Sequence, residues 1–289
     1  MKELGGVGVA LATPQNRDYS IDFEGLERLI NHVVAGGADY LVVMGTTAEA
    51  PVFSWKEKLQ VLEFVMQQTS EKLPIVFGHG GNHTFNLIER TKDLKDYPIA
   101  ALLSASPYYS KPSQEGILRH YEMLGDAFPH PIILYNVPSR TASNMEAETT
   151  LKLARHENII GIKEASVDMR QCKKVLANKP QDFLFLSGND HTTFELIQSG
   201  AEGVISVVAN LVPKQFRQMV KSGLDGEFGN AEQLNSALLT AYDLSSAEGN
   251  PSSIKAGLES AGICAKTVKP PLFDASTELV AQWNNYLGK

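Results

Sequence analysis

The sequence Ile159-Ile160-Gly161-Ile162-Lys163-Glu164-Ala165-Ser166 is a short apolar run that carries a lysine near its end. Apolar runs of this length, bounded by Gly or polar residues, are typical of strands buried in a parallel sheet. Desolvation disfavours the charged form of an amine, so a lysine at a dry strand end can attack carbonyl groups as a nucleophile. The alternative is that Lys163 lies just past the strand and extends its ammonium into water.

Eight apolar runs of this kind alternate with helical patterns along the chain. They cover Gly6–Ala12, Tyr40–Met44, Ile75–Phe77, Ile99–Leu103, Ile132–Leu134, the stretch quoted above, Phe183–Leu186 and Val204–Val208. Because the chain passes through a helix between one strand and the next, the strands should be parallel. Eight parallel strands close a (β/α)8 TIM barrel. An open doubly wound sheet is the alternative, but no G-x-G-x-x-G motif follows the first run. The pattern therefore predicts an α/β barrel.

The eighth predicted helix covers about Pro213 to Gly223, and the pattern of alternating strands and helices ends after it. Only helical faces follow, the first carrying Phe228 and Leu238 and the last carrying Trp283 and Tyr286. We therefore predict a catalytic barrel over residues 1–225 and a small C-terminal helical domain over residues 226–289.

Composition restricts the class of protein. A chain of 289 residues suits a barrel of about 250 residues, and a formal net charge of -7 argues against a nucleic-acid partner. Cys172 and Cys264 have no metal-site spacing and indicate reduced thiols. The N-terminus lacks the features of a signal peptide, and no apolar stretch approaches the ~20 residues that span a bilayer. We therefore expect a cytoplasmic protein without a membrane partner.

Polar side chains follow several of the predicted strands. In a barrel, the loops after the strands open on one face, and that face carries the active site. It would gather Thr46 and Thr47, Tyr108 and Tyr109, Tyr135 and Arg140, Lys163, and Gly188. An amine condenses with a ketone to an iminium, and hydroxyl groups can relay the protons that this reaction moves. Paired threonines can bind one carboxylate and an arginine a second one. The set therefore indicates carbonyl chemistry.

Each of these residues also has a purely structural interpretation. Tyr135 could be a core tyrosine bonded to a carbonyl, and the paired threonines could cap a turn. Tyr108 and Tyr109 could be an interface pair, and Arg140 could form a surface ion pair. Gly188-Asn189-Asp190 is typical of a turn. His79 follows the third strand but has no second ligand at a metal spacing, so we predict no metal site.

Several strand ends together resemble one protein family. The motifs are Gly45-Thr46-Thr47-Ala48-Glu49, Ser106-Pro107-Tyr108-Tyr109, Pro112-Ser113-Gln114-Glu115-Gly116, Tyr135-Asn136-Val137-Pro138-Ser139-Arg140-Thr141 and Gly161-Ile162-Lys163-Glu164-Ala165. They are similar to signatures of the class I pyruvate-dependent lyase/synthase family, which includes dihydrodipicolinate synthase and N-acetylneuraminate lyase. The resemblance covers essentially the whole chain. The arginine after Asn-Val-Pro-Ser favours the dihydrodipicolinate synthase branch.

This resemblance implies a reaction and a role for each residue. Pyruvate would form a Schiff base on Lys163, and the enamine would attack L-aspartate 4-semialdehyde in the diaminopimelate route to lysine. By this resemblance, Tyr135, Thr47 and a neighbouring subunit's Tyr109 would form a proton relay. Thr46 and Thr47 would bind the pyruvate carboxylate, and Arg140 would bind the carboxylate of the aldehyde substrate. Gly188 and Ile205 would line the pyruvate pocket. The family also implies a homotetramer built from tight dimers, and no organic cofactor.

The sequence departs from the family pattern at two places. Ala48 replaces a glycine, which would be costly at positive φ, and we expect an ordinary backbone conformation and retained activity. The second departure is in the pocket where the end product lysine inhibits some members. Asn82 and Tyr108 match that pocket, but Lys58 and Asn86 replace a His and a Glu, and Trp55 stands where another His or an aromatic residue is found. An added cation and a lost carboxylate disfavour a cationic effector, so we expect weak or absent inhibition by lysine.

Two other functions are compatible with the same sequence. A pyruvate aldolase or lyase of this fold could act on another aldehyde, such as a sugar acid. A barrel without catalytic activity could retain the motifs as a binding protein or scaffold. Because Tyr135 and Lys163 occur together, the catalytic interpretation is favoured.

Overall fold

The computed structural model describes residues 4–69 and 73–289 and contains a closed barrel of eight parallel strands. The strands are β1 (Gly6–Ala10), β2 (Tyr40–Val43), β3 (Ile75–Gly78), β4 (Ala101–Ala105), β5 (Ile132–Asn136), β6 (Ile159–Glu164), β7 (Leu184–Ser187) and β8 (Gly203–Ser206). They follow one another around the barrel in chain order, and β8 pairs with β1. The predicted TIM barrel is therefore confirmed.

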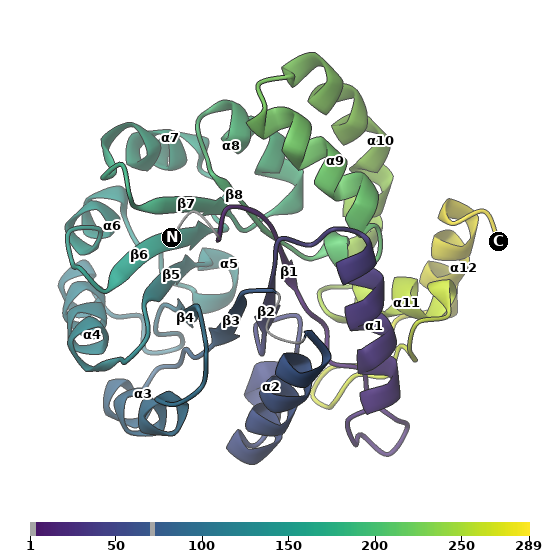
Figure 1. Ribbon diagram of the computed structural model, residues 1–289, viewed down its shortest axis with the longest axis horizontal. Coiled ribbons are helices and arrows are strands. Elements are labelled where there is room, and N and C mark those ends of the chain that lie inside the picture. The colour runs from purple at the N-terminus through teal and green to yellow at the C-terminus, as the bar shows by residue number, and fades with distance from the viewer. Residues whose placement is uncertain (1–3, 70–72) are drawn as a thin grey trace.

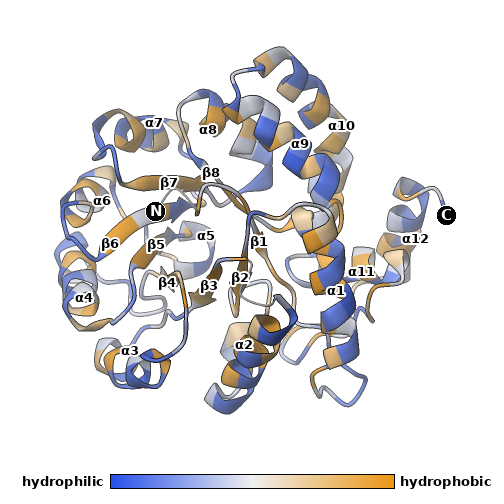
Figure 2. Ribbon diagram, in the orientation of Figure 1, coloured by the Kyte–Doolittle hydropathy of each residue, from blue (hydrophilic) through white to orange (hydrophobic). Residues whose placement is uncertain are grey.

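Helices surround the barrel on the outside (Figure 1). They are α1 (Phe23–Ala35), α2 (Trp55–Thr69), α3 (Thr84–Thr91), α4 (Gln114–Ala127), α6 (Ala147–Leu153), α7 (Met169–Asn178), α8 (Thr193–Gln198) and α9 (Pro213–Leu224). The short helix α5 (Pro138–Thr141) follows β5 and lies within this ring of helices in Figure 1. Apolar residues colour the strands and the inner sides of the helices, whereas polar residues lie on the outer sides (Figure 2). The core therefore has two layers, one inside the barrel and one between the strands and the helices.

The interior of the barrel is filled by side chains rather than open. Tyr40 is fully buried, and a Cβ atom at Gly8 would lie 2.2 Å from the Tyr40 ring. The absence of a side chain at Gly8 thus makes room for an aromatic ring in the interior layer. Above it, toward the carboxyl ends of the strands, lie Leu186, Ile205 and Tyr135.

Three helices follow the barrel, as the sequence predicts. They are α10 (Phe228–Ser246), α11 (Ser252–Ala261) and α12 (Thr277–Tyr286). In Figure 1, α10 lies along α9, and α11 and α12 lie outside α1. Arg28 of α1 donates from Nε to the carbonyl oxygen of Ile263 at 2.8 Å, which joins this segment to the barrel. The boundary at residue 225 falls between α9 and α10, and its use as a domain boundary stays a prediction.

Some predicted strand ends are wrong by one or two residues. The fourth strand begins at Ala101 instead of Ile99 and extends to Ala105, because Ser104 and Ala105 pair with Leu134 and Tyr135 of β5. Val207 and Val208 lie beyond β8, and their backbone amides donate to Asp190 at 3.1 and 2.9 Å. A side-chain acceptor therefore replaces the strand partner of these two residues.

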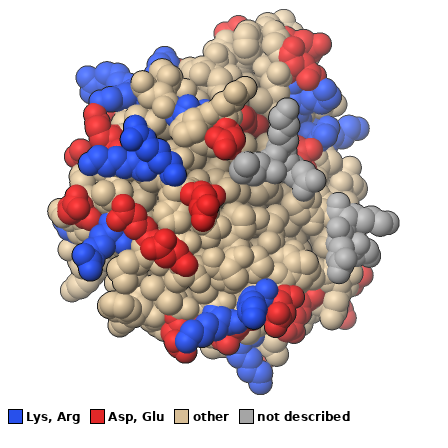
Figure 3. Space-filling view, turned by 60° about the vertical axis from the view of Figure 1, so that its left-hand side comes forward, with Lys and Arg blue, Asp and Glu red and all other residues tan. Residues whose placement is uncertain are grey.

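On the face shown in Figure 3, acidic and basic side chains lie next to each other around a broad uncharged area. Among residues 4–69 and 73–289, no helix combines the length and the apolar character that crossing a membrane requires.

Candidate active site

Lys163 lies inside strand β6 and not beyond its end. It pairs with Tyr135 of β5 and Leu186 of β7, and only 4% of the residue is exposed. Its Nζ atom lies 4.4 Å from the centre of the Tyr135 ring, and the described residues offer it no carboxylate within ion-pair distance. The alternative of a lysine that extends into water is therefore wrong. The amine is buried in the barrel next to a phenol ring.

Tyr135 is the residue that faces this amine. Its side chain belongs to the interior layer together with Leu186 and Ile205. In the part of the chain that the structure describes, its hydroxyl group has no hydrogen-bond partner, so it is not a core tyrosine bonded to a carbonyl. A phenol placed in this way can exchange protons with a substrate bound to Lys163.

The paired threonines lie on a sharply turned loop after β2. Met44 and Glu49, at either end of the loop, adopt positive φ angles of 57° and 59°, which are uncommon for residues other than glycine. Ala48 is buried and is not among the residues with positive φ, so the expected ordinary conformation at this position is confirmed. The amide of Glu49 donates to the Thr46 carbonyl oxygen at 3.0 Å, which closes the turn.

Thr47 and Arg140 both contact Asn250, which lies between α10 and α11. The Asn250 amide donates from Nδ2 to Thr47 Oγ1 at 3.0 Å, and Arg140 donates from Nη2 to the Asn250 carbonyl oxygen at 3.0 Å. No carboxylate among the described residues pairs with Arg140, so its interpretation as a surface ion pair is wrong. Asn250 cannot be identified from the sequence, because neither its spacing nor its surroundings in the sequence distinguish it.

A buried ion pair fixes the same loop to helix α11. Lys255 donates from Nζ to Glu49 Oε1 at 2.5 Å, and both side chains are completely buried. Glu49 also accepts from Gln15 Nε2 at 2.9 Å and from the Lys269 amide at 2.8 Å. Burial lowers the pKa of Lys255, and the adjacent Glu49 carboxylate opposes this shift. The loop with the threonines is thus held by the C-terminal helices.

The two residues predicted to line the pyruvate pocket are in the barrel. Ile205 of β8 is buried in the interior layer. Gly188 follows β7, and a Cβ atom there would lie 2.8 Å from Ala165 Cβ and 3.0 Å from the Glu164 carbonyl oxygen. Only a residue without a side chain allows this close approach of the loops after β6 and β7.

Asp190 is a second residue whose importance the sequence did not indicate. The predicted turn is Gly188-Asn189-Asp190, and the structure has a short 3-10 helix over Asp190–Thr192. Burial raises the pKa of Asp190, while the amides of Val208 and Val207 and the charge of Lys163 oppose the rise. One carboxylate oxygen, Oδ1, is buried without a partner among the described residues. Asp190 is therefore a buried carboxyl group that accepts the amides after β8.

Tyr109 is on the surface of the single chain. It is 90% exposed, and its φ of 72° lies in the left-handed region. A strained backbone that presents an aromatic side chain to solvent is typical of a contact with another molecule. Within one chain, Tyr109 does not take part in the cluster around Lys163.

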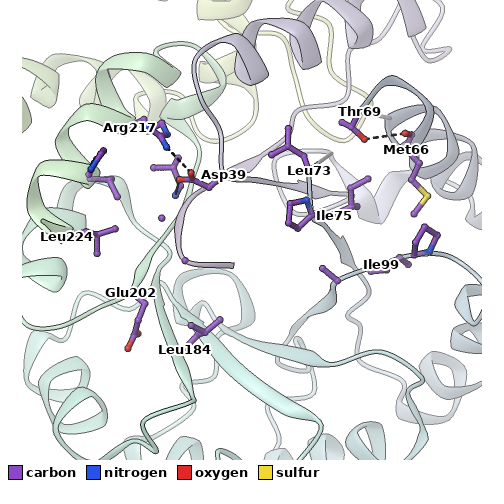
Figure 4. A pocket seen from close by; sticks show the side chains of 18 of the residues that line it. Asp39, Met66, Thr69, Leu73, Ile75, Ile99, Leu184, Glu202, Arg217 and Leu224 are labelled. Carbon is purple, nitrogen blue, oxygen red and sulfur yellow. Dashed lines mark hydrogen bonds and ion pairs between the residues drawn. The ribbon is translucent and has the colours of Figure 1, made fainter. Parts of the chain in front are cut away.

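No group of three or more potential metal ligands occurs in residues 4–69 and 73–289. A cavity of about 1350 Å³ lies at the opposite end of the barrel, next to the starts of β1, β3 and β7 (Figure 4). Its walls include Asp39 and Arg217, which form an ion pair with 3.1 Å between Oδ1 and Nη2. Because Lys163 lies near the carboxyl ends of the strands, this cavity is not the active site.

Comparison with known proteins agrees with the barrel fold described above. The model of the dihydrodipicolinate synthetase family matches residues 3–288. A 4-hydroxy-tetrahydrodipicolinate synthase from Flavobacterium psychrophilum is 45% identical over 280 residues, which cover 96% of each chain. A chloride-inhibited dihydrodipicolinate synthase from Acinetobacter baumannii, solved with pyruvate, is 33% identical with a TM-score of 0.96, and the match covers 99% of this chain and 98% of that one.

A third relative is a monomeric dihydrodipicolinate synthase variant of known structure. It is 32% identical with a TM-score of 0.96, and the match covers 99% of this chain and 96% of that one. The sequence, the barrel and the buried lysine therefore lead to one assignment. The chain belongs to the dihydrodipicolinate synthetase family.

Proposed function

We propose that this protein is a lyase that condenses pyruvate with L-aspartate 4-semialdehyde, the reaction of a 4-hydroxy-tetrahydrodipicolinate synthase in the diaminopimelate route to lysine. The observation that carries the proposal is the buried amine of Lys163, 4.4 Å from the ring of Tyr135, at the carboxyl ends of the strands. The match to enzymes named for this activity over nearly the whole chain supports it.

The proposed reaction begins at the amine of Lys163. It adds to the keto carbon of pyruvate and expels water, which gives an iminium ion. Loss of a proton from the methyl carbon gives an enamine, whose carbon attacks the aldehyde of the second substrate. Tyr135 and Thr47 would relay the protons, with Tyr109 of a neighbouring subunit completing the chain. The amino group of the second substrate then displaces Lys163, which closes the ring and releases the enzyme.

The carboxylates of the two substrates would bind at two different parts of the site. Thr46 and Thr47, on the loop after β2, would bind the carboxylate of pyruvate, with Gly188 and Ile205 lining the pocket. Arg140 would bind the carboxylate of the aldehyde substrate, because its guanidinium carries several donors and has no acidic partner among the described residues.

A coupled assay tests this assignment directly. The protein is supplied with pyruvate and either L-aspartate 4-semialdehyde or an aldehyde sugar, and consumption of pyruvate is followed. Turnover with the amino-acid aldehyde and none with the sugar supports the proposal. Turnover with the sugar alone would instead identify a sugar-acid aldolase of the same fold.

We also propose a homotetramer composed of two tight dimers, located in the cytoplasm. The exposed and strained Tyr109 supports the tight dimer, since a partner chain would bury its ring. Sedimentation equilibrium measures the mass of the assembly. A monomer with full activity would contradict both the dimer and the role of Tyr109 across the interface.

Lysine should inhibit this protein weakly or not at all. The region of the family's effector pocket carries Lys58 and, in addition, Arg90, whose guanidinium carbon lies 5.4 Å from the centre of the Trp55 ring. Burial and the charge of Arg90 lower the pKa of Lys58, as expected when two cations lie near each other. Burial also lowers the pKa of the adjacent His79 to about 4. A second cationic amine would be repelled by this cluster.

The measurement is the steady-state rate at increasing lysine concentrations. The double variant Lys58→His and Asn86→Glu removes one cation and adds one carboxylate, so it should become more sensitive to lysine than the unmodified protein. Strong inhibition of the unmodified protein would contradict the prediction.

A further inference from the structure

Side chains do not alternate regularly along strand β6. Ile160 belongs to the layer inside the barrel and Ile162 to the layer outside it, although residues two apart in a regular strand point to the same side. The pairing of β6 with β5 also shifts by one residue at this place, between Ile132 and Ile133 of β5. Strand β6 therefore contains a β-bulge with one extra residue.

The bulge determines where the reactive lysine points. Without the extra residue, Lys163 would point outward and Glu164 into the barrel, because side chains alternate along a strand. With the bulge, Lys163 faces Tyr135, its partner on β5, in the interior. Gly161 lies at the bulge, and a Cβ atom there would lie 2.8 Å from the Leu184 Cβ atom of β7. The active site therefore depends on the shifted register of β6.

The side chain of Glu164 fastens this register from outside the barrel. It lies opposite Asn136 of β5, which donates from Nδ2 to both carboxylate oxygens at 3.0 Å. These two residues directly follow Lys163 and Tyr135 in their strands. A bond between the outer pair therefore fixes the inner pair at the same height in the barrel. The Ser166 amide also donates to Glu164, at 2.7 Å.

The direction of the bond between the two strands is fixed by a third residue. Asn136 Oδ1 accepts from the Met145 amide at 3.0 Å, so the NH2 end of Asn136 must face Glu164. Glu164 is 1% exposed and has no cation within ion-pair distance among the described residues. A buried carboxylate without a cation destabilises a protein, so the two acceptor oxygens that it offers give the better reason for its presence.

We propose that Glu164, through its bonds to Asn136, is a positioning residue for the amine of Lys163. It holds the bulged register of β6 that brings this amine to Tyr135. The inference rests on the proposed function, since it concerns the nucleophile of that reaction. When the bond is weakened, the amine should attack pyruvate more slowly. Binding of the second substrate should not change, because Arg140 lies outside this network.

The experiment measures formation of the borohydride-trapped adduct with pyruvate alone and turnover with L-aspartate 4-semialdehyde. Glu164→Gln can turn an NH2 group toward the NH2 group of Asn136 and should lower the adduct rate and kcat by about tenfold. Asn136→Asp places two acidic groups against each other and should lower kcat by ~100-fold. The KM for the aldehyde should change by less than about twofold in both variants.

A double variant exchanges the donor and the acceptor. In Asn136→Asp with Glu164→Gln, the NH2 group is on β6 and the carboxylate on β5, so the bond can form again in the opposite direction. Residue 136 can still accept from the Met145 amide, and residue 164 from the Ser166 amide. The double variant should therefore be at least about tenfold more active than Asn136→Asp alone.

Glu202→Gln is the matched control, since it makes the same substitution at the opposite end of the barrel. Glu202 accepts from the Phe185 amide of β7 at 2.8 Å and pairs with Lys179 at 2.6 Å. Its replacement should lower the unfolding midpoint but leave kcat within about twofold, because the reaction takes place at the carboxyl ends of the strands. All rates are measured at a temperature at which each variant is folded.

Two results would overturn the proposal. If Glu164→Gln formed the adduct as fast as the unmodified protein, the position of the amine would not depend on this bond. If the double variant were no more active than Asn136→Asp, the two residues would not act through their mutual bond. Failure of the proposed function would look different, because then the unmodified protein itself would not turn over.

Discussion

Replacement of Lys163 by alanine should abolish both turnover and covalent capture of pyruvate. With the amine removed, no iminium ion can form, and the rate should fall by at least ~10⁴-fold, as is typical when an enzyme loses its covalent nucleophile. The fold should survive, because the backbone pairing of β6 with β5 and β7 does not depend on the side chain. The measurement is reduction with borohydride in the presence of pyruvate, followed by intact-mass and peptide analysis.

The controls separate nucleophilicity from charge and from general reactivity. Lys163→Arg keeps a positive charge beside Tyr135 but offers no comparable nucleophile, so it should also fail to form the adduct. Lys92 is exposed and should remain unlabelled in the unmodified protein. An adduct that persists in Lys163→Ala would remove Lys163 as the nucleophile. No adduct in the folded, unmodified protein would favour a binding protein without catalytic activity.

Replacement of Lys255 by methionine should destabilise the protein by ~3–5 kcal/mol, because a buried carboxylate is left without its cation. Both side chains of the Lys255–Glu49 pair are completely buried, so solvent cannot compensate for the loss. The measurement is the free energy of unfolding in denaturant. Activity should fall as well, since Glu49 lies two residues after Thr47.

A second variant and an exposed pair serve as controls. In Glu49→Gln with Lys255→Met, the charge is removed from both sides, and the amide oxygen can keep one of the two bonds, either from Gln15 to Oε1 or from Lys269 to Oε2, so part of the stability should return. Lys92→Met breaks an exposed pair with Glu89 and should cost less than about 1 kcal/mol. An equal loss for Lys255→Met and Lys92→Met would contradict the role assigned to burial.

The sequence predicts the barrel well, because parallel strands buried on both sides leave continuous apolar runs. It predicts strand ends less well. Val207 and Val208 continue an apolar run, yet they lie beyond β8, since Asp190 accepts their amide protons. That acceptor lies 17 and 18 residues earlier in the chain, and no local pattern indicates it.

The residues of the active site also differ in whether the sequence alone can identify them. Lys163, Tyr135 and the threonine pair can be identified because each stands at the end of an apolar run where a polar residue needs an explanation. Asn250 lies between α10 and α11, and Lys255 lies in α11, where asparagine and lysine are common, so the contacts of these residues become evident only after folding. The proposed role of Tyr109 depends on a second chain, and a single sequence does not give the position of that chain.

The position of Asn250 and Lys255 has a consequence for the order in which this protein becomes functional during its synthesis. The ribosome releases all eight strands before it releases the segment that contacts Thr47 and neutralises Glu49. Contacts across more than 200 residues form late, because the chain must first close a long loop. A nascent barrel would therefore hold its reactive lysine before its relay is aligned, and full activity would begin only when the last helices dock.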